Sequence, residues 1–115
     1  MKYMVFAGYQ PERAAAQSAE DSQEMMRAIA AWFEKYGKQG KVVWQGHQLD
    51  DAAKTIRAGA GGEPVVTDGP FVESKEVIGG ITVLEWDSMD EAVAAAAEWT
   101  SFGYGFTMEV RPAFD

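Results

Sequence analysis

Apolar and polar positions alternate along this chain in two periods, which separate its expected strands from its expected helices. Residues 3–8 form a short run of aromatic and aliphatic side chains that is typical of a strand. After a polar, alanine-rich connection, apolar residues recur at helical spacing from about residue 19 to 39, at Met25, Ile29, Trp32, Phe33 and Tyr36. Ser18 is a suitable N-cap. The pattern predicts a strand followed by one long amphipathic helix.

The middle of the chain is less regular and carries most of the turn signals. Residues 41–45 contain Val42, Val43 and Trp44 and indicate a second strand. A polar segment, residues 46–54, holds His47, the one histidine of the sequence. Two runs, 55–57 and 65–67, flank a glycine-rich stretch and predict a β-hairpin. The sequence Asp68-Gly69-Pro70-Phe71 that follows is a strong turn signal.

The last third of the chain repeats the strand, helix and strand pattern. Residues 77–86 predict a long strand that begins around Gly79-Gly80, a pair that can mark a bulge or a close backbone approach. Ser88 and Glu91 form a capping box. The helix that follows is expected to bury Val93, Ala96, Ala97 and Trp99. In the last strand, 106–111, one face is Phe106, Met108 and Val110, and the other is Thr107, Glu109 and Arg111.

The predicted order is β-α-β, an inserted hairpin, and β-α-β again. Without the hairpin this is the split βαβ arrangement of ferredoxin-like folds, so we expect an α+β protein with both helices on one face of an antiparallel sheet. The other face would mix aromatic and charged side chains, which suits a symmetric partner across a cleft. The 115 residues fit a single domain, 1–115, working as a homodimer.

Composition narrows the classes of function. The chain has no cysteine, and one histidine with scattered carboxylates is a poor pattern for a metal site, so we expect no metal and no cofactor. A formal net charge of −8 argues against binding to nucleic acid, which needs a basic surface. No run approaches the roughly 20 apolar residues of a membrane span. The first apolar run ends at Gly8, too early for a signal peptide, so we expect a cytoplasmic protein without membrane contact.

Two residues are candidate acids or bases, and each has a structural alternative. Histidine titrates near neutral pH, which suits His47 to proton transfer, but a loop histidine is more often exposed or capping. Asp68 can accept backbone N–H groups and pin its turn, or it can face a cleft as a base or an arginine partner. Both interpretations of each residue stay open at the level of sequence.

A second set of residues suits a small anion. Strand alternation points Arg111 away from the helices, and Arg57 precedes the hairpin that leads into the turn motif. Arginine binds a carboxylate or phosphate through two parallel hydrogen bonds, although an ion pair with Glu109, Glu73 or Asp68 is the simpler alternative. Lys75 could meet such an anion at the cleft, although the mixed charge run Glu73, Lys75 and Glu76 is more typical of a solvated edge. Phe71 could be an apolar wall of the cleft or part of the core.

The stretch from Thr67 to Gly80, with Asp68-Gly69-Pro70-Phe71 at its start, resembles the DGPF branch of the YCII-related proteins. The start Met1-Lys2-Tyr3-Met4, the Thr55-Ile56-Arg57 run and the ending Glu109-Val110-Arg111-Pro112 fit that family too, so the resemblance covers nearly the whole chain. It implies a dimeric α+β barrel in which two ferredoxin-like sheets face each other. The His–Asp dyad proposed in the family has no counterpart here, because residues 22–24 and 98–102 lack both members.

Three functional hypotheses follow. The leading one is an uncharacterised DGPF-type protein that binds a small anionic ligand in a dimer cleft. The second is an enzyme without metal, a lyase or dehydrochlorinase, that uses Asp68 or His47 as acid or base. The third, implied by the resemblance alone, is a partner protein associated with an extracytoplasmic-function sigma factor.

Overall fold

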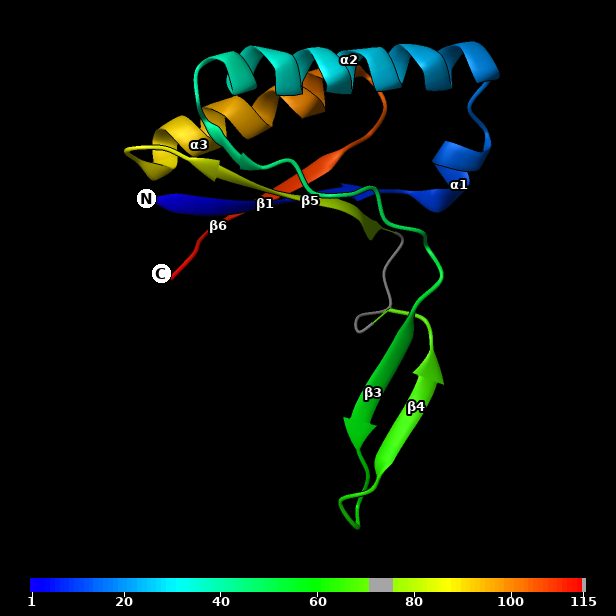
Figure 1. Ribbon diagram of the computed structural model, residues 1–115. Helices are drawn as coiled ribbons and strands as arrows, with labels where there is room; N and C mark the ends of the chain where they lie inside the picture. Colours follow the sequence, from blue (N-terminus) through cyan, green and yellow to red (C-terminus); the bar gives the residue numbers. More distant parts are fainter. Residues whose placement is uncertain (71–75, 115) are drawn as a thin grey trace.

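A four-stranded antiparallel sheet carries the helices on one face, and a separate hairpin extends from it (Figure 1). This computed structural model describes residues 1–70 and 76–114. The elements in chain order are β1 (Lys2–Tyr9), α1 (Pro11–Ala15), α2 (Ala19–Lys38), β2 (Val42–Trp44), β3 (Lys54–Ala58), β4 (Pro64–Asp68), β5 (Val77–Glu85), α3 (Met89–Ala97), the 3-10 helix η1 (Glu98–Phe102) and β6 (Thr107–Pro112).

The strand order of the main sheet is β2-β5-β1-β6, and every neighbouring pair is antiparallel. Each long helix therefore connects two strands that are not adjacent, as the split βαβ arrangement requires. The prediction of an α+β protein is confirmed, and the arrangement is consistent with a ferredoxin-like fold. Within the described residues, no helix is long and apolar enough to cross a membrane.

The core lies between the sheet and the two long helices. On β1, Tyr3, Val5 and Ala7 are buried because alternate side chains of a strand share one face. Val5 and Ala7 belong to one cluster with apolar residues of α2, β5, α3 and η1, namely Trp32, Tyr36, Leu84, Ala95, Ala96 and Trp99. The predicted apolar face of α2 is confirmed, and its N-cap is Ser18, whose hydroxyl accepts the backbone N–H of Asp21 at 3.0 Å.

The predicted face of α3 is partly wrong. The buried residues are Ala92, Ala95 and Ala96, whereas Val93 is 48% exposed and Ala97 is also exposed. The stripe at 92, 95, 96 and 99 follows helical spacing, and the small alanine side chains let the helix approach the sheet closely. The sequence-based choice favoured the larger Val93, which lies one position away from that stripe.

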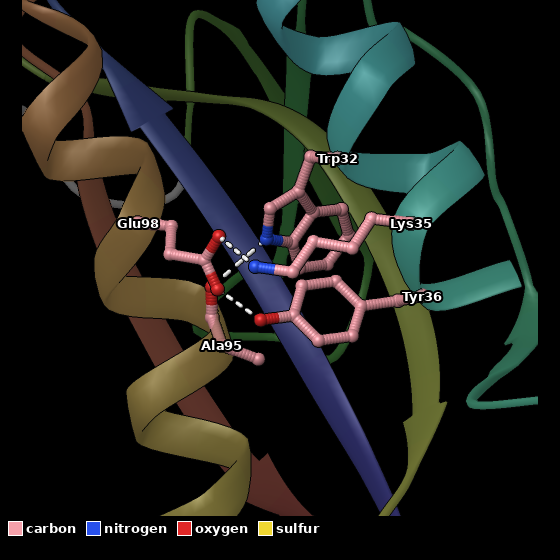
Figure 2. A network of polar contacts seen from close by, with 5 residues as sticks. All are labelled: Trp32, Lys35, Tyr36, Ala95 and Glu98. Carbon is pink, nitrogen blue, oxygen red and sulfur yellow. Dashed lines mark hydrogen bonds and ion pairs between the residues drawn. The ribbon is translucent and has the colours of Figure 1, made fainter. Parts of the chain in front are cut away.

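A polar network joins α2 to α3 (Figure 2). The indole N–H of Trp32 donates to the carbonyl of Ala95 at 2.9 Å, and Lys35 pairs with Glu98 at 3.0 Å. The hydroxyl of Tyr36 also bonds to the Glu98 carboxylate. Burial, followed by this hydrogen bond to Glu98, raises the pKa of Tyr36 above its ordinary value.

The glycine pair in β5 lies at an irregularity of the sheet, as the sequence indicated. The pairing of β1 with β5 shifts between Ala7 and Gly8, opposite Gly79 and Gly80. A Cβ added at Gly79 would lie 2.6 Å from two ring carbons of Tyr9, so the tyrosine ring packs directly on the backbone there. The short helix α1 was not predicted, although Pro11 at its first position is a known start signal.

The predicted hairpin is present, but it is not part of the main sheet. Strands β3 and β4 pair only with each other, with Ile56 opposite Val66. Figure 1 shows the hairpin projecting on the side of the sheet opposite the helices. Its side chains are largely exposed, including 66% of Ile56 and 58% of Val66.

Candidate functional site

A cavity of about 400 Å³ lies between α2 and the sheet, beside the irregular part of β5. Its walls come from six parts of the chain: β1 with Gln10, α1 and the turn after it, the middle of α2, residues 45–49, the first half of β5, and residues 99–108. Side chains from α2 that line it are Met25, Met26, Ile29 and Phe33. The volume falls in the range typical of small-molecule sites.

The cavity has an apolar, buried floor and a polar, exposed rim. Val5, Ala7, Trp99 and half-buried Phe106 and Met108 belong to the floor. The rim includes the glutamine side chains Gln10, Gln45 and Gln48, all exposed, with half-buried Gln17 nearby. An amide can both donate and accept hydrogen bonds, so the rim can orient a polar group while the floor holds an apolar body.

The segment 45–49 is fixed against β5 by backbone contacts. The Leu49 N–H donates to the carbonyl of Gly79 at 2.7 Å, and Gln48 forms a bridge with Gly80. Gly46 has a φ of +78° and packs so tightly on the Ile81 carbonyl that any Cβ would collide with it. These contacts hold one side of the rim in place next to the glycine pair.

Two tyrosines of the rim lie close to carboxylates. Burial, with the negative charges of Asp51 and Asp50, raises the pKa of Tyr9. On the other side, burial and the charges of Glu24 and Asp21 raise the pKa of Tyr104, whose hydroxyl is 3.5 Å from Glu24. Both shifts have the direction expected where an additional negative charge is unfavourable.

Trp99 is nine-tenths buried in the wall of the cavity and has an unusual polar atom. Its indole N–H has no hydrogen-bond acceptor within the described part of the chain. Its neighbours are aromatic: Phe106 packs edge-on with ring centroids 5.2 Å apart, and Trp32 at 5.5 Å. This part of the floor is therefore built from rings packed edge-to-face, which offer apolar contact to a flat group.

Among the predicted site residues that the structure describes, only His47 lines this cavity. It is exposed, and its ring packs edge-on against Trp44 with centroids 6.1 Å apart. Its carbonyl oxygen would lie 3.7 Å from a Cβ added at Gly80. The residue is thus at the rim, where its imidazole can reach solvent.

The other predicted site residues that the structure describes lie elsewhere. Asp68 and Arg57 are on the hairpin, where the Asp68 carboxylate forms an exposed ion pair with Lys54. Arg111 lies on the open face of the main sheet, opposite Met4 of β1, and is 3.9 Å from Glu109. Phe71 and Lys75 lie outside the described residues. Within this chain the structure does not bring Asp68, Arg57, Arg111 and His47 together.

Sequence reasoning missed most of the cavity. Met25, Ile29 and Phe33 were recognised only as an apolar helix face, and Tyr9, Gln17 and Tyr104 were not singled out. One signal was available, since the Gly79-Gly80 pair indicated a close backbone approach at this place. In the described ranges, no group of three or more histidine, aspartate and glutamate side chains is arranged to hold a metal ion.

The fold and the comparisons agree on the class of protein. Residues 1–112 match the YCII-related domain, and the chain therefore belongs to the YCII-related family. A relative from Rhizobium meliloti (strain 1021), the uncharacterised protein R00369, is 33% identical over 114 residues, which cover 97% of this chain and 91% of that protein. These matches establish the family, and the chemistry of its lining residues indicates what the cavity can bind.

Proposed function

We propose that this YCII-related protein binds a small molecule in the cavity between α2 and the sheet, and that it does so as a cytoplasmic homodimer. The single observation that supports ligand binding is the cavity of about 400 Å³ with a buried apolar floor and an exposed polar rim. Ligand sites commonly combine these two features, because apolar contact supplies affinity and a few polar groups supply orientation.

Narrowing the cavity tests this proposal. Gly80 lies on its wall, and an added Cβ would meet only the His47 carbonyl at 3.7 Å, an ordinary contact. Gly80→Val should therefore fill part of the cavity while the protein still folds. We expect small aromatic alcohols, amines and carboxylates that raise the melting temperature of the wild type to lose that effect in this variant. Gly37→Ala, on an exposed turn of α2 with open space around it, is the control.

The homodimer proposal is supported by the shape of the chain. Its radius of gyration is 16.1 Å, whereas a compact chain of this length has about 13 Å. The larger radius of gyration accompanies the projecting hairpin. A two-stranded hairpin alone is marginally stable in water, so it needs a surface to pack on. The open face of the sheet also carries Met4, Phe6 and Val83 without a covering layer among the described residues. A second copy of the chain would cover both surfaces.

A small anion in the dimer cleft is a second candidate, favoured by Arg111. This side chain is 69% exposed on the open face, and its contact with Glu109 is long, at 3.9 Å. In a dimer it would line the cleft, with Arg57, Lys75 and Phe71 as the other groups proposed from sequence. Arg111→Lys keeps the charge and loses the two-pronged geometry, so benzoate and phosphate should raise its melting temperature less than that of the wild type. Equal shifts in both proteins would contradict this candidate.

The DGPF branch and the remaining hypotheses rest on sequence. Asp68-Gly69-Pro70-Phe71 supports the branch assignment, and the association with a sigma factor is supported by resemblance alone. A lyase or dehydrochlorinase needs an acid or base at its ligand. Because His47 lines the cavity and Asp68 is on the hairpin, His47→Gln is the variant that tests catalysis in the cavity.

A further inference from the structure

Within the described chain, the residues that line the cavity include no lysine, arginine, aspartate or glutamate, and the ionisable ones are Tyr9, His47 and Tyr104. Charge selectivity must therefore come from groups just outside the rim. A carboxylate or phosphate entering this cavity would lose water without gaining a cationic partner among the described wall residues.

The groups just outside the rim are mainly acidic. Asp50 and Asp51 follow the segment that closes one side, and they act on Tyr9. Asp21 and Glu24 of α2 lie on the other side and act on Tyr104. Both tyrosines lie within the reach of these carboxylates, so a ligand between the tyrosines is placed in a negative field.

A cationic side chain also lies near this rim and offsets part of its negative charge. Arg13 of α1 donates a hydrogen bond to the Gly103 carbonyl at 3.0 Å, and its guanidinium packs over Gly105. It is therefore held against the turn that carries Tyr104. Among the described residues, these four carboxylates outweigh Arg13, so the rim is negative, in keeping with the overall charge of −8.

We infer that the cavity binds a small organic cation with an apolar body, an amine or ammonium compound, in preference to a carboxylate of the same shape. This inference rests on the proposed function, that the cavity binds a small molecule. The apolar body would lie on the ring-lined floor beside Phe33, Trp99 and Phe106. The charged head would lie at the rim, where tyrosine rings, glutamine carbonyls and nearby carboxylates all favour a cation.

Three molecules with the same aromatic body test the inference: phenethylamine, phenethyl alcohol and phenylacetate. Their dissociation constants would be measured by ligand-observed NMR at about pH 8, where the amine is charged and phenylacetate is ionised. We expect the amine to bind about tenfold more tightly than phenylacetate, which corresponds to about 1.4 kcal/mol, with the alcohol between them.

Two double variants test whether the rim carboxylates cause the preference for the amine. Asp50→Asn with Asp51→Asn removes two rim charges, and the amide oxygen at position 50 can still accept the Ala52 N–H that the carboxylate accepts at 3.0 Å. The preference for the amine should fall several-fold in this variant. Glu85→Gln with Asp87→Asn, at the opposite end of β5, is the matched control and should keep the full preference.

The possible outcomes separate the inference from the proposed function. Phenylacetate binding as tightly as the amine, with both lost in Gly80→Val, would overturn the inference and leave a ligand-binding cavity. A preference for the amine that survives unchanged in the rim variant would also overturn it. Binding of none of the three molecules would contradict the proposed function itself.

Discussion

Two adjacent glycines in β5 have different surroundings, and the difference is set by a single side chain. At Gly79 the Tyr9 ring occupies the place where a Cβ would go, with two ring carbons 2.6 Å away. At Gly80 the corresponding position is open apart from the His47 carbonyl at 3.7 Å. The sequence pointed to a close approach somewhere in this pair, but it could not say which glycine is constrained, because the constraint comes from a residue 70 positions away.

Alanine substitutions at these two positions should therefore differ. Gly79→Ala forces the Tyr9 ring to move and should lower the free energy of unfolding by about 1–3 kcal/mol. Gly80→Ala should change it by less than about 0.5 kcal/mol. Urea unfolding of both variants measures this. In a Tyr9→Ala background the cost at Gly79 should largely disappear, and a cost that persists there would show that the ring is not its cause.

Asp68 is the last residue of β4, where its carboxylate pairs with Lys54. Its side chain is 85% exposed. An exposed ion pair contributes little to stability. Asp68→Ala should lower the free energy of unfolding by no more than about 1 kcal/mol. A loss of about 2 kcal/mol or more in chemical denaturation would restore the structural role first considered for Asp68.

At the scale of elements, Glu98 joins α2 to the end of α3, because its carboxylate accepts hydrogen bonds from Tyr36 and Lys35 of α2 (Figure 2). Tyr36 is 6% exposed, so its hydroxyl depends on this carboxylate rather than on water. Tyr36→Phe keeps the ring packing and removes the hydrogen bond. We expect a loss of about 1–2 kcal/mol at neutral pH, measured by thermal or urea unfolding.

The same tyrosine gives the stability a pH dependence with a defined sign. Because the folded protein raises the pKa of Tyr36, the folded state holds this proton more tightly than the unfolded chain does. The contribution is complete below the unfolded tyrosine value of about 10 and is lost as pH rises through the higher folded pKa. Wild type should therefore lose stability above about pH 10 more steeply than Tyr36→Phe. Parallel curves for the two proteins would contradict this assignment.

Elements were easier to predict than the site they build. Apolar periodicity located β1, α2, β5 and β6 within a few residues, since each element buries one face and that requirement is local. The short α1 lacks any buried residue, so periodicity could not find it. The cavity requires side chains from six separate parts of the chain, and no local pattern records which of them meet.

At the scale of the whole molecule, the hairpin exposes apolar side chains that no other described part of the chain covers. Ile56 and Val66 lie opposite each other on β3 and β4, and both are more than half exposed. If this pair packs on a second copy, a charge there should weaken the dimer. Ile56→Lys is expected to raise the dimer dissociation constant at least tenfold, about 1.4 kcal/mol, in sedimentation equilibrium.

Val93→Lys provides the matched control for that experiment. Val93 is also an exposed aliphatic residue, 48% accessible, but it lies on α3 in the helical layer, away from the hairpin and the open face of the sheet. The same change in charge there should leave association unchanged. A wild type that stays monomeric at micromolar concentrations would refute the dimer and the proposed cleft together.

The place where the hairpin leaves the domain adds a consequence for regulation. Strand β3 follows directly on residues 45–53, and the first part of this segment forms the cavity rim while Asp50 and Asp51 supply its charge. A partner that holds the hairpin would also restrict the rim, so subunit association and ligand occupancy would share one coupling free energy. Thermodynamic reciprocity then requires that whatever factor dimerisation adds to ligand affinity, saturating ligand adds to dimer affinity. The protein would sense its own concentration and that of its ligand through the same short segment.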